Sequence, residues 1–175
     1  EVPVDQTMEL YGDGGGTFNF NDNLTLSGTL KLNALNNTLS NGTLIINNGL
    51  LQLDENTTIS MQISLADNAS MDLATGKQLS LTKTLNIPQD LKLTMLGTGG
   101  GILSLTEILK LEGILHFAAP DYSLINGKLE LNDGSLLDVD YHTIIDSDIV
   151  LLGNTTVDVA SGMNLQYRGD KRDFI

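Results

Sequence analysis

The sequence predicts an all-β fold, a right-handed parallel β-helix (β-solenoid) built from two tandem repeats of 85 to 86 residues. Three observations predict it: the chain aligns with itself, apolar residues alternate with polar ones, and glycine-rich turns separate the alternating stretches. Residues 1–49 match residues 86–134 at 17 of 49 positions without a gap. Once Ser135 is skipped, residues 50–81 match residues 136–167 at 12 of 32 positions. Internal repetition of this kind is typical of solenoids.

The alternating apolar residues define the expected strands in chain order. Apolar residues two positions apart indicate a strand with one buried face. The apolar pairs of the first repeat run from Met8/Leu10 and Phe18/Phe20 through Leu24/Leu26 and Leu44/Ile46 to Leu79/Leu81. Their counterparts in the second repeat lie in MLGTGGGILSL, LKLEGILHF, INGKLELNDG and NTTVDVASGMNL. Strand and turn recur about every nine or ten residues, so three strands per turn predict about three coils in each repeat.

Glycine, Asn-Gly and Asp-Gly separate these expected strands, and they tolerate the positive φ angles of tight turns. The glycines retained between the repeats include Gly12, Gly14, Gly15 and Gly16, which recur as Gly97, Gly99, Gly100 and Gly101. The segment Thr106–Leu111 has a briefly helical pattern, but its counterpart NDNLTL does not. We therefore expect a strand there as well, in a chain without helices.

We divide the chain into a first repeat at residues 1–85, a second at residues 86–171 that continues the first, and a tail at residues 172–175. A repeat of this length also matches an immunoglobulin-like domain, so two tandem β-sandwiches joined near Ile87–Asp90 are the alternative. The glycine–strand element recurs inside each repeat as GTFNF, GTLKL, GTLII, GKLEL and GILHF. A solenoid consists of such sub-repeats and a sandwich does not need them, which favours the solenoid.

The composition limits the classes of partner. Four Phe, four Tyr and no Trp favour a narrow leucine-rich core. The net charge of −13 argues against nucleic acid, whose phosphates would be repelled, and is simply explained by solubility. Cysteine is absent, so neither disulfides nor thiol chemistry contribute. No apolar run approaches the roughly 18 residues that a membrane span needs.

The stretch LTLSGTLKLNALNNTLSNGTLIINNGLLQL, at residues 24–53, resembles repeats of bacterial autotransporter passengers and filamentous-haemagglutinin-type adhesins. Those families share runs of the form G-x-L-x-[LIV]-x-x-G-x-L, and the resemblance extends more weakly along both repeats. It implies a secreted, extended and surface-exposed β-solenoid that serves adhesion, assembly or display. These families carry no fixed catalytic residues that could be transferred to this chain.

The densest acidic stretch of the chain is DGSLLDVDYHTIIDSD. It contains Asp133, Asp138, Asp140, His142, Asp146 and Asp148. Asp138 and Asp140 alternate, so both are expected on one outward face. A solvated face is the simplest interpretation; a calcium site of carboxylates and turn carbonyls, or a catalytic carboxylate pair, are the alternatives. His116 stands where the first repeat has Lys31 and is expected on the surface.

Other motifs are interpreted as structural. YGDGGG at residues 11–16 lacks the tandem Asp of a calcium-binding repeat and the helix and Lys of a phosphate loop, so we interpret it as a tight turn. The regular Thr-x-Thr ladder of an ice-binding face is missing. Six Asn-x-Ser/Thr sequons occur, at Asn23, Asn36, Asn41, Asn56, Asn68 and Asn154. They are glycosylation acceptors if the source glycosylates such sites, and turn residues otherwise.

The sequence therefore predicts a non-enzymatic, extracellular or cell-surface structural or adhesive protein: an adhesin stalk, a fibre or a sheath subunit. Open solenoid ends predict a homo-oligomer or fibre, and a surface glycan or a host or cell-surface partner is the other expected contact. We assign no catalytic, cofactor-binding or metal-binding residue. The alternative is a carbohydrate-binding or carbohydrate-degrading β-helix with a groove lined by Tyr11, Tyr122, Tyr141 or Tyr167.

Overall fold

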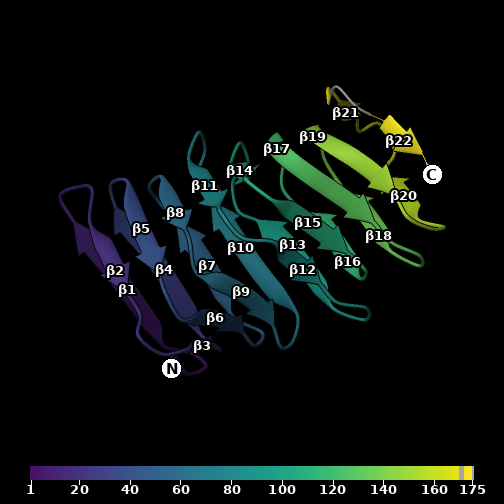
Figure 1. The fold of residues 1–175 in the computed structure, drawn as a ribbon. Helices are drawn as coiled ribbons and strands as arrows, with labels where there is room; N and C mark the ends of the chain where they lie inside the picture. Colours follow the sequence, from purple (N-terminus) through teal and green to yellow (C-terminus); the bar gives the residue numbers. More distant parts are fainter. Residues whose placement is uncertain (170–171, 175) are drawn as a thin grey trace.

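The protein is an all-β solenoid of about eight turns in a computed structural model that describes residues 1–169 and the backbone of residues 172–174. Residues 170, 171 and 175, at the end of the second repeat and in the tail, lie outside the described residues. Strands about 21 residues apart pair in parallel, and the turns follow one another from the N-terminus to the C-terminus (Figure 1). This confirms the solenoid, because tandem sandwiches would have antiparallel sheets.

The solenoid has three faces. The first face contains β1 (Thr7–Gly12), β4 (Thr29–Ala34), β7 (Leu50–Leu53), β10 (Ala69–Leu73), β13 (Lys92–Leu96), β16 (Ile114–Phe117), β18 (Leu136–Val139) and β20 (Thr156–Val159). The second face contains β2 (Thr17–Asn19), β5 (Asn37–Ser40), β8 (Thr57–Ile59), β11 (Gln78–Leu81), β14 (Ile102–Leu105), the first halves of β17 (Tyr122–Leu131) and β19 (Thr143–Leu151), and β21 (Leu165–Tyr167).

The third face begins with β3 (Leu24–Leu26), β6 (Thr43–Ile46) and β9 (Gln62–Leu65). It continues with β12 (Leu85–Ile87), β15 (Ile108–Leu111), the second halves of β17 and β19, and β22 (Arg172–Phe174). β9 contacts β12, but the hydrogen-bonded ladder is interrupted between them. The strand expected within Thr106–Leu111 is confirmed by β15.

Each repeat forms four turns, so the expectation of about three coils per repeat is wrong. Equivalent strands β1 and β13 begin at Thr7 and Lys92, and the three strands between them on the first face are β4, β7 and β10. The expectation failed because many connections are only two residues long, such as Ser27–Gly28 between β3 and β4. The β10–β13 and β11–β14 ladders cross from the first repeat into the second.

The core is a single stack of apolar side chains that runs through the turns. One inward row on the first face consists of Leu30, Leu51, Met71, Met95, Phe117 and Val139, all fully buried and in register. The strands of the row alternate buried and partly exposed residues, as the period of two predicts. The outward residues of the same strands are therefore free to differ between repeats.

A close backbone approach explains one retained glycine pair. A Cβ atom at Gly28 would overlap the Pro3 carbonyl oxygen, and one at Gly113 would overlap the Pro88 carbonyl oxygen. Pro3 and Pro88 are themselves equivalent positions of the two repeats. The duplicated chain therefore retains the corner at which β4 and β16 begin, and it does so for steric reasons.

Candidate functional site

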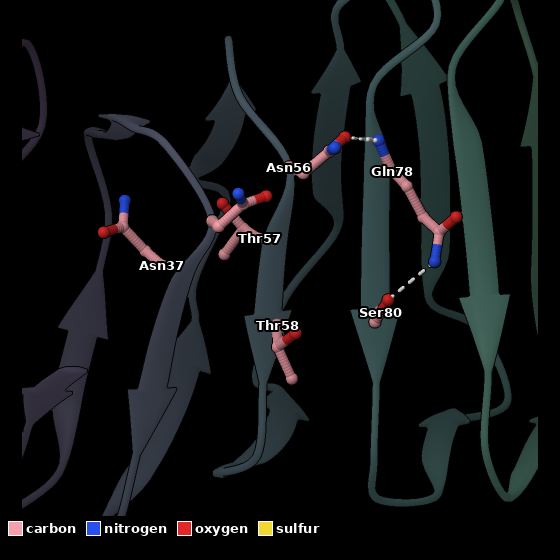
Figure 2. A pocket seen from close by; sticks show the side chains of 7 residues that line it. Asn37, Asn56, Thr57, Thr58, Gln78 and Ser80 are labelled. Atoms are coloured by element: carbon pink, nitrogen blue, oxygen red, sulfur yellow. Dashed lines mark hydrogen bonds between the residues drawn. The ribbon is translucent and has the colours of Figure 1, made fainter. Parts of the chain in front are cut away.

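A polar groove lies at the corner where the first face turns into the second, in the second to fourth turns (Figure 2). Its lining consists of neutral amides and hydroxyls: Asn36, Asn37, Asn56, Thr57, Thr58, Gln78 and Ser80. The cavity volume is about 260 Å³. Strands β5, β8 and β11 position these side chains side by side, so the groove runs across successive turns of the solenoid.

Hydrogen bonds between and within turns order this groove. The backbone N–H of Gln78 donates to Asn56 Oδ1 at 2.9 Å, and Gln78 Nε2 donates to Ser80 Oγ at 2.8 Å (Figure 2). The buried Asn37 side chain donates from Nδ2 to the Ala34 carbonyl oxygen. The amides thus face a prospective ligand from held positions and offer it only neutral donors and acceptors.

The second repeat contains a groove at the same corner. It is lined by Asp121, His142, Thr143, Ile144, Asn164 and Gln166, with a volume of about 200 Å³. These are the aligned counterparts of Asn36, Asn56, Thr57, Thr58, Gln78 and Ser80. The backbone is retained, since Asn36 and Asp121 have φ angles of 54° and 58°. The chemistry is not, because the second groove has gained a carboxylate and an imidazole.

A two-row ladder of hydroxyl and amide side chains follows the outward side of the second face over five turns. One row consists of Thr17, Thr38, Thr58, Ser80 and Ser104. The second row lies two residues further along each strand and consists of Asn19, Ser40, Ser60, Thr82 and Thr106. The sequence contains no regular Thr-x-Thr motif. The stacking register nevertheless aligns mixed threonine, serine and asparagine positions into one ladder.

The acidic stretch predicted as one feature is divided by the fold. Asp138 and Asp140 lie in and just after β18 on the first face, whereas Asp146 and Asp148 lie in β19. Asp133 Oδ1 accepts the backbone N–H of Asn154 at 3.0 Å, so it links two neighbouring turns of the solenoid.

Asp138 and Asp140 meet His116, which sequence reasoning placed on the surface. His116 and Asp138 are in register on β16 and β18. His116 Nε2 lies 2.8 Å from Asp140 Oδ2 and 3.7 Å from Asp138 Oδ2. Lys92 Nζ lies 3.4 Å from the other ring nitrogen, Nδ1. The imidazole points outward but is only 14% exposed, because its neighbours cover it. No local sequence signal joins these residues, which lie more than twenty positions apart.

The equivalent place in the first repeat holds a built-in cation. Lys31 Nζ lies 3.1 Å from Asp54 Oδ2 and 3.4 Å from Glu9 Oε1. The hydrogen bond to Asp54 is the main reason that the pKa of Lys31 is raised. Burial and the neighbouring Asp54 carboxylate raise the pKa of Asp72, which lies one turn further along this face.

The alternative hypothesis placed Tyr122 in a carbohydrate-binding groove, and this prediction is wrong. This side chain is fully buried, and its hydroxyl accepts the Leu73 N–H at 3.0 Å and donates to the Leu96 carbonyl oxygen. Burial raises the pKa of Tyr122 to about 12. Tyr11 and Tyr141 are exposed but lie on the first and seventh turns.

All six sequon asparagines are exposed. Asn56 and Asn68 use their side-chain oxygens as acceptors for backbone N–H groups of the next turn. The amide nitrogen is the atom that a glycan would modify, so these contacts leave the predicted modification sterically open. Glycosylation itself stays a prediction.

Comparisons of the chain with protein-family models, curated proteins and solved structures found no match. Among the described residues, none forms a helix long and apolar enough to pass through a membrane.

Proposed function

We propose that the protein is a non-enzymatic, extracellular structural or adhesive β-solenoid, such as an adhesin stalk, a fibre or a sheath subunit. The observation that supports this proposal is one apolar core that is continuous through about eight turns and both repeats. Stacked parallel strands with paired backbones make a stiff element. The resemblance to autotransporter-passenger and filamentous-haemagglutinin-type repeats in residues 24–53 agrees with this role.

The differences between the two repeats also support a role in which the outer surface of the solenoid is presented to binding partners. The repeats retain turn glycines and inward leucines, whereas the residues that line the two grooves differ at five of six aligned positions. A scaffold that presents its outer face to partners requires fixed inward residues and leaves the outward residues free.

Assembly is part of the proposal, because the strand edges at the N-terminal end of the described solenoid are open. Eight turns at a strand spacing of about 4.8 Å give roughly 38 Å of length. The outer edges of β1 and β2 pair with no strand among the described residues. Such edges can add the strands of another copy, so we expect growth along the solenoid axis.

Sedimentation and negative-stain microscopy test the proposal over a range of protein concentrations. Ordered oligomers or fibres that lengthen with concentration are the expected result. A species that stays monomeric at high concentration contradicts self-assembly, and turnover of a glycan would contradict the non-enzymatic role.

The duplicated corner groove favours a second candidate, binding of a neutral glycan. Amides and hydroxyls are the groups that recognise sugar hydroxyls, and a net hydrogen bond contributes about 1 kcal/mol. On a glycan panel, Asn56→Ala combined with Gln78→Ala should weaken binding roughly tenfold. The matched control is Gln62→Ala, an exposed amide on the third face that should change nothing. Equal binding by both variants would contradict a role for the groove.

A further inference from the structure

We propose that His116, Asp138 and Asp140 form a binding site for one divalent transition-metal ion of the zinc type on the first face of the second repeat. The inference stands independently of the proposed structural role. It combines one imidazole nitrogen with two carboxylate oxygens, supplied by two adjacent turns of the solenoid.

The distances fit such an ion. One ligand atom from each of the three residues lies within 4.8 Å of the other two. In tetrahedral coordination with bonds of about 2.0–2.1 Å, ligand atoms are roughly 3.3 Å apart. The two distances from His116 Nε2, 2.8 Å and 3.7 Å, lie on either side of that value. Small side-chain rotations would therefore complete the geometry without movement of the strands.

The contacts of the imidazole show what metal binding would change. Lys92 Nζ lies 3.4 Å from Nδ1 and can only donate there, so without metal the ring proton is on Nε2, which faces Asp140 Oδ2 at 2.8 Å. Metal-binding histidines donate from their second ring nitrogen, so a metal ion on Nε2 requires the ring proton on Nδ1 and the Lys92 ammonium group turned away from it. The ring itself is only 14% exposed, so its neighbours restrict its orientation.

The first repeat supplies an internal comparison that points to a cation. There the equivalent of His116 is Lys31, and its ammonium group occupies the space beside Asp54, the equivalent of Asp140. In the second repeat Gln52 is replaced by Asp138, which adds a carboxylate, while the ammonium group is lost. Among the described residues, the ion pairs of Asp138 and Asp140 are with His116 alone. The first repeat thus places the Lys31 ammonium group at this position, whereas the second repeat places three potential metal ligands there.

The donor set selects the kind of ion. Calcium and magnesium take oxygen ligands, whereas a mixed nitrogen and oxygen set suits zinc, cobalt or nickel. This differs from the calcium site considered for the acidic stretch, which used carboxylates and turn carbonyls. Three protein ligands leave a fourth position for water or for a group of a binding partner.

Titration of the full chain with Co²⁺ tests the site, because its absorption spectrum reports the ligand environment, and calorimetry with Zn²⁺ gives the affinity. We expect one equivalent of Co²⁺ to bind and Zn²⁺ to displace it. His116→Lys, which copies Lys31 of the first repeat, should weaken Zn²⁺ binding at least about tenfold while thermal unfolding without metal stays cooperative. Asp138→Asn and Asp140→Asn should each weaken it as well.

The chain contains a matched control, since its only other histidine is His142 in the second groove. His142→Ala should bind Zn²⁺ as the unchanged protein does. The proposal is overturned if the unchanged protein binds no Zn²⁺ under these conditions, if His116→Lys binds with unchanged affinity, or if His142→Ala loses as much affinity as His116→Lys. Displacement of Co²⁺ by equimolar Ca²⁺ would also overturn it, because it would show a site without a nitrogen ligand.

Discussion

The two repeats share a backbone and fill it differently, and the corner between the first and second faces shows this most clearly. In the first repeat the inward position at the start of β5 is the short amide Asn37. In the second it is Tyr122, whose ring packs against Phe117 with 6.2 Å between centroids. The counterpart of Phe117 is Leu32. The two repeats thus share the path of the backbone, but the sizes of their buried side chains at this corner differ.

The outer surface diverged further than the core. The first repeat has a neutral groove and a Lys31 that is paired internally, whereas the second places imidazoles at both of these positions. The first row of the two-row hydroxyl and amide ladder ends at Ser104, because the residue in register with it in the next turn is Ile125. The comparison indicates that both histidines and the charged corner groove belong to the second repeat, whereas the first repeat has a neutral corner groove and a lysine whose charge is paired within the chain.

The largest expected effect tests the core difference at a glycine that both repeats retain. At Gly101 a Cβ atom would overlap Leu73 Cβ in the preceding turn and would lie 2.8 Å from Tyr122 Cε1, whereas at Gly16 the nearest atom is Asn37 Oδ1 at 3.7 Å. Gly101→Ala should destabilise the protein by about 2–3 kcal/mol because of overpacking. Gly16→Ala should be neutral or stabilising by about 0.5 kcal/mol. Urea unfolding measures both, and equal effects would refute the difference in packing.

The next effect concerns the Tyr122 hydroxyl. Tyr122→Phe leaves the Leu73 N–H and the Leu96 carbonyl without this partner in the core, which should cost about 1–2 kcal/mol. The folded-state pKa of Tyr122 is raised to about 12 from 10, so its contribution is fully present below pH 10 and is lost as the pH rises through 12. The stability gap between the two proteins should therefore narrow between pH 10 and pH 12. A gap that stays constant over that range would contradict the burial of a neutral phenol.

A smaller effect is expected for the cation of the first repeat. Lys31→Gln removes the ammonium group from between Glu9 and Asp54 and should lower the melting temperature slightly. High salt should reduce the loss, because the pair is partly exposed to solvent. Melting at low and high ionic strength measures it; a loss independent of salt would indicate that Lys31 acts through packing of its aliphatic stem instead.

The smallest effect compares equivalent aspartates. Burial raises the pKa of Asp72, with the Asp54 carboxylate adding to it, so ionised Asp72 is unfavourable in the folded state. Asp72→Asn should stabilise the protein at pH 7 by less than about 0.5 kcal/mol after solvent screening. The gain should vanish as the pH falls below the ordinary carboxyl pKa, near 3.8, because Asp72 is then neutral in both states. The exposed counterpart Asp158 is the control, and an equal gain from Asp158→Asn would contradict burial as the cause.

The sequence predicted the strands and the parallel stacking correctly but miscounted the turns. Strands follow from alternation, and turns follow from residues such as Asn41 that adopt positive φ, here 59°. The count failed because the expected spacing of nine or ten residues per strand and turn was too long; three strands share turns of about 21 residues, and many connections have only two residues. The alternative hypothesis listed Tyr122 as a groove residue, although its spacing of two positions from Leu124 already indicates the inward face of the strand.

The candidate sites could not be predicted from the sequence, because they depend on the pairing offset between strands. His116 and Asp138 meet because β16 and β18 pair with an offset of 22 residues, whereas Leu50 and Ser70 pair with an offset of 20 and Ser70 and Thr94 with one of 24. One extra or missing residue in any connection would place different side chains together.

The sequence alone therefore determined what is local: alternating strands, glycine turns and a duplicated scaffold, because residue spacing and backbone φ preferences act within a few positions of the chain. Only the tertiary structure decided which outward side chains meet between turns. Their neighbours are set by the stacking register, which depends on the length of every connection. The duplication is visible in the sequence, but the contrast between a paired Lys31 and a ligand-like His116 cluster appears only once the turns are stacked.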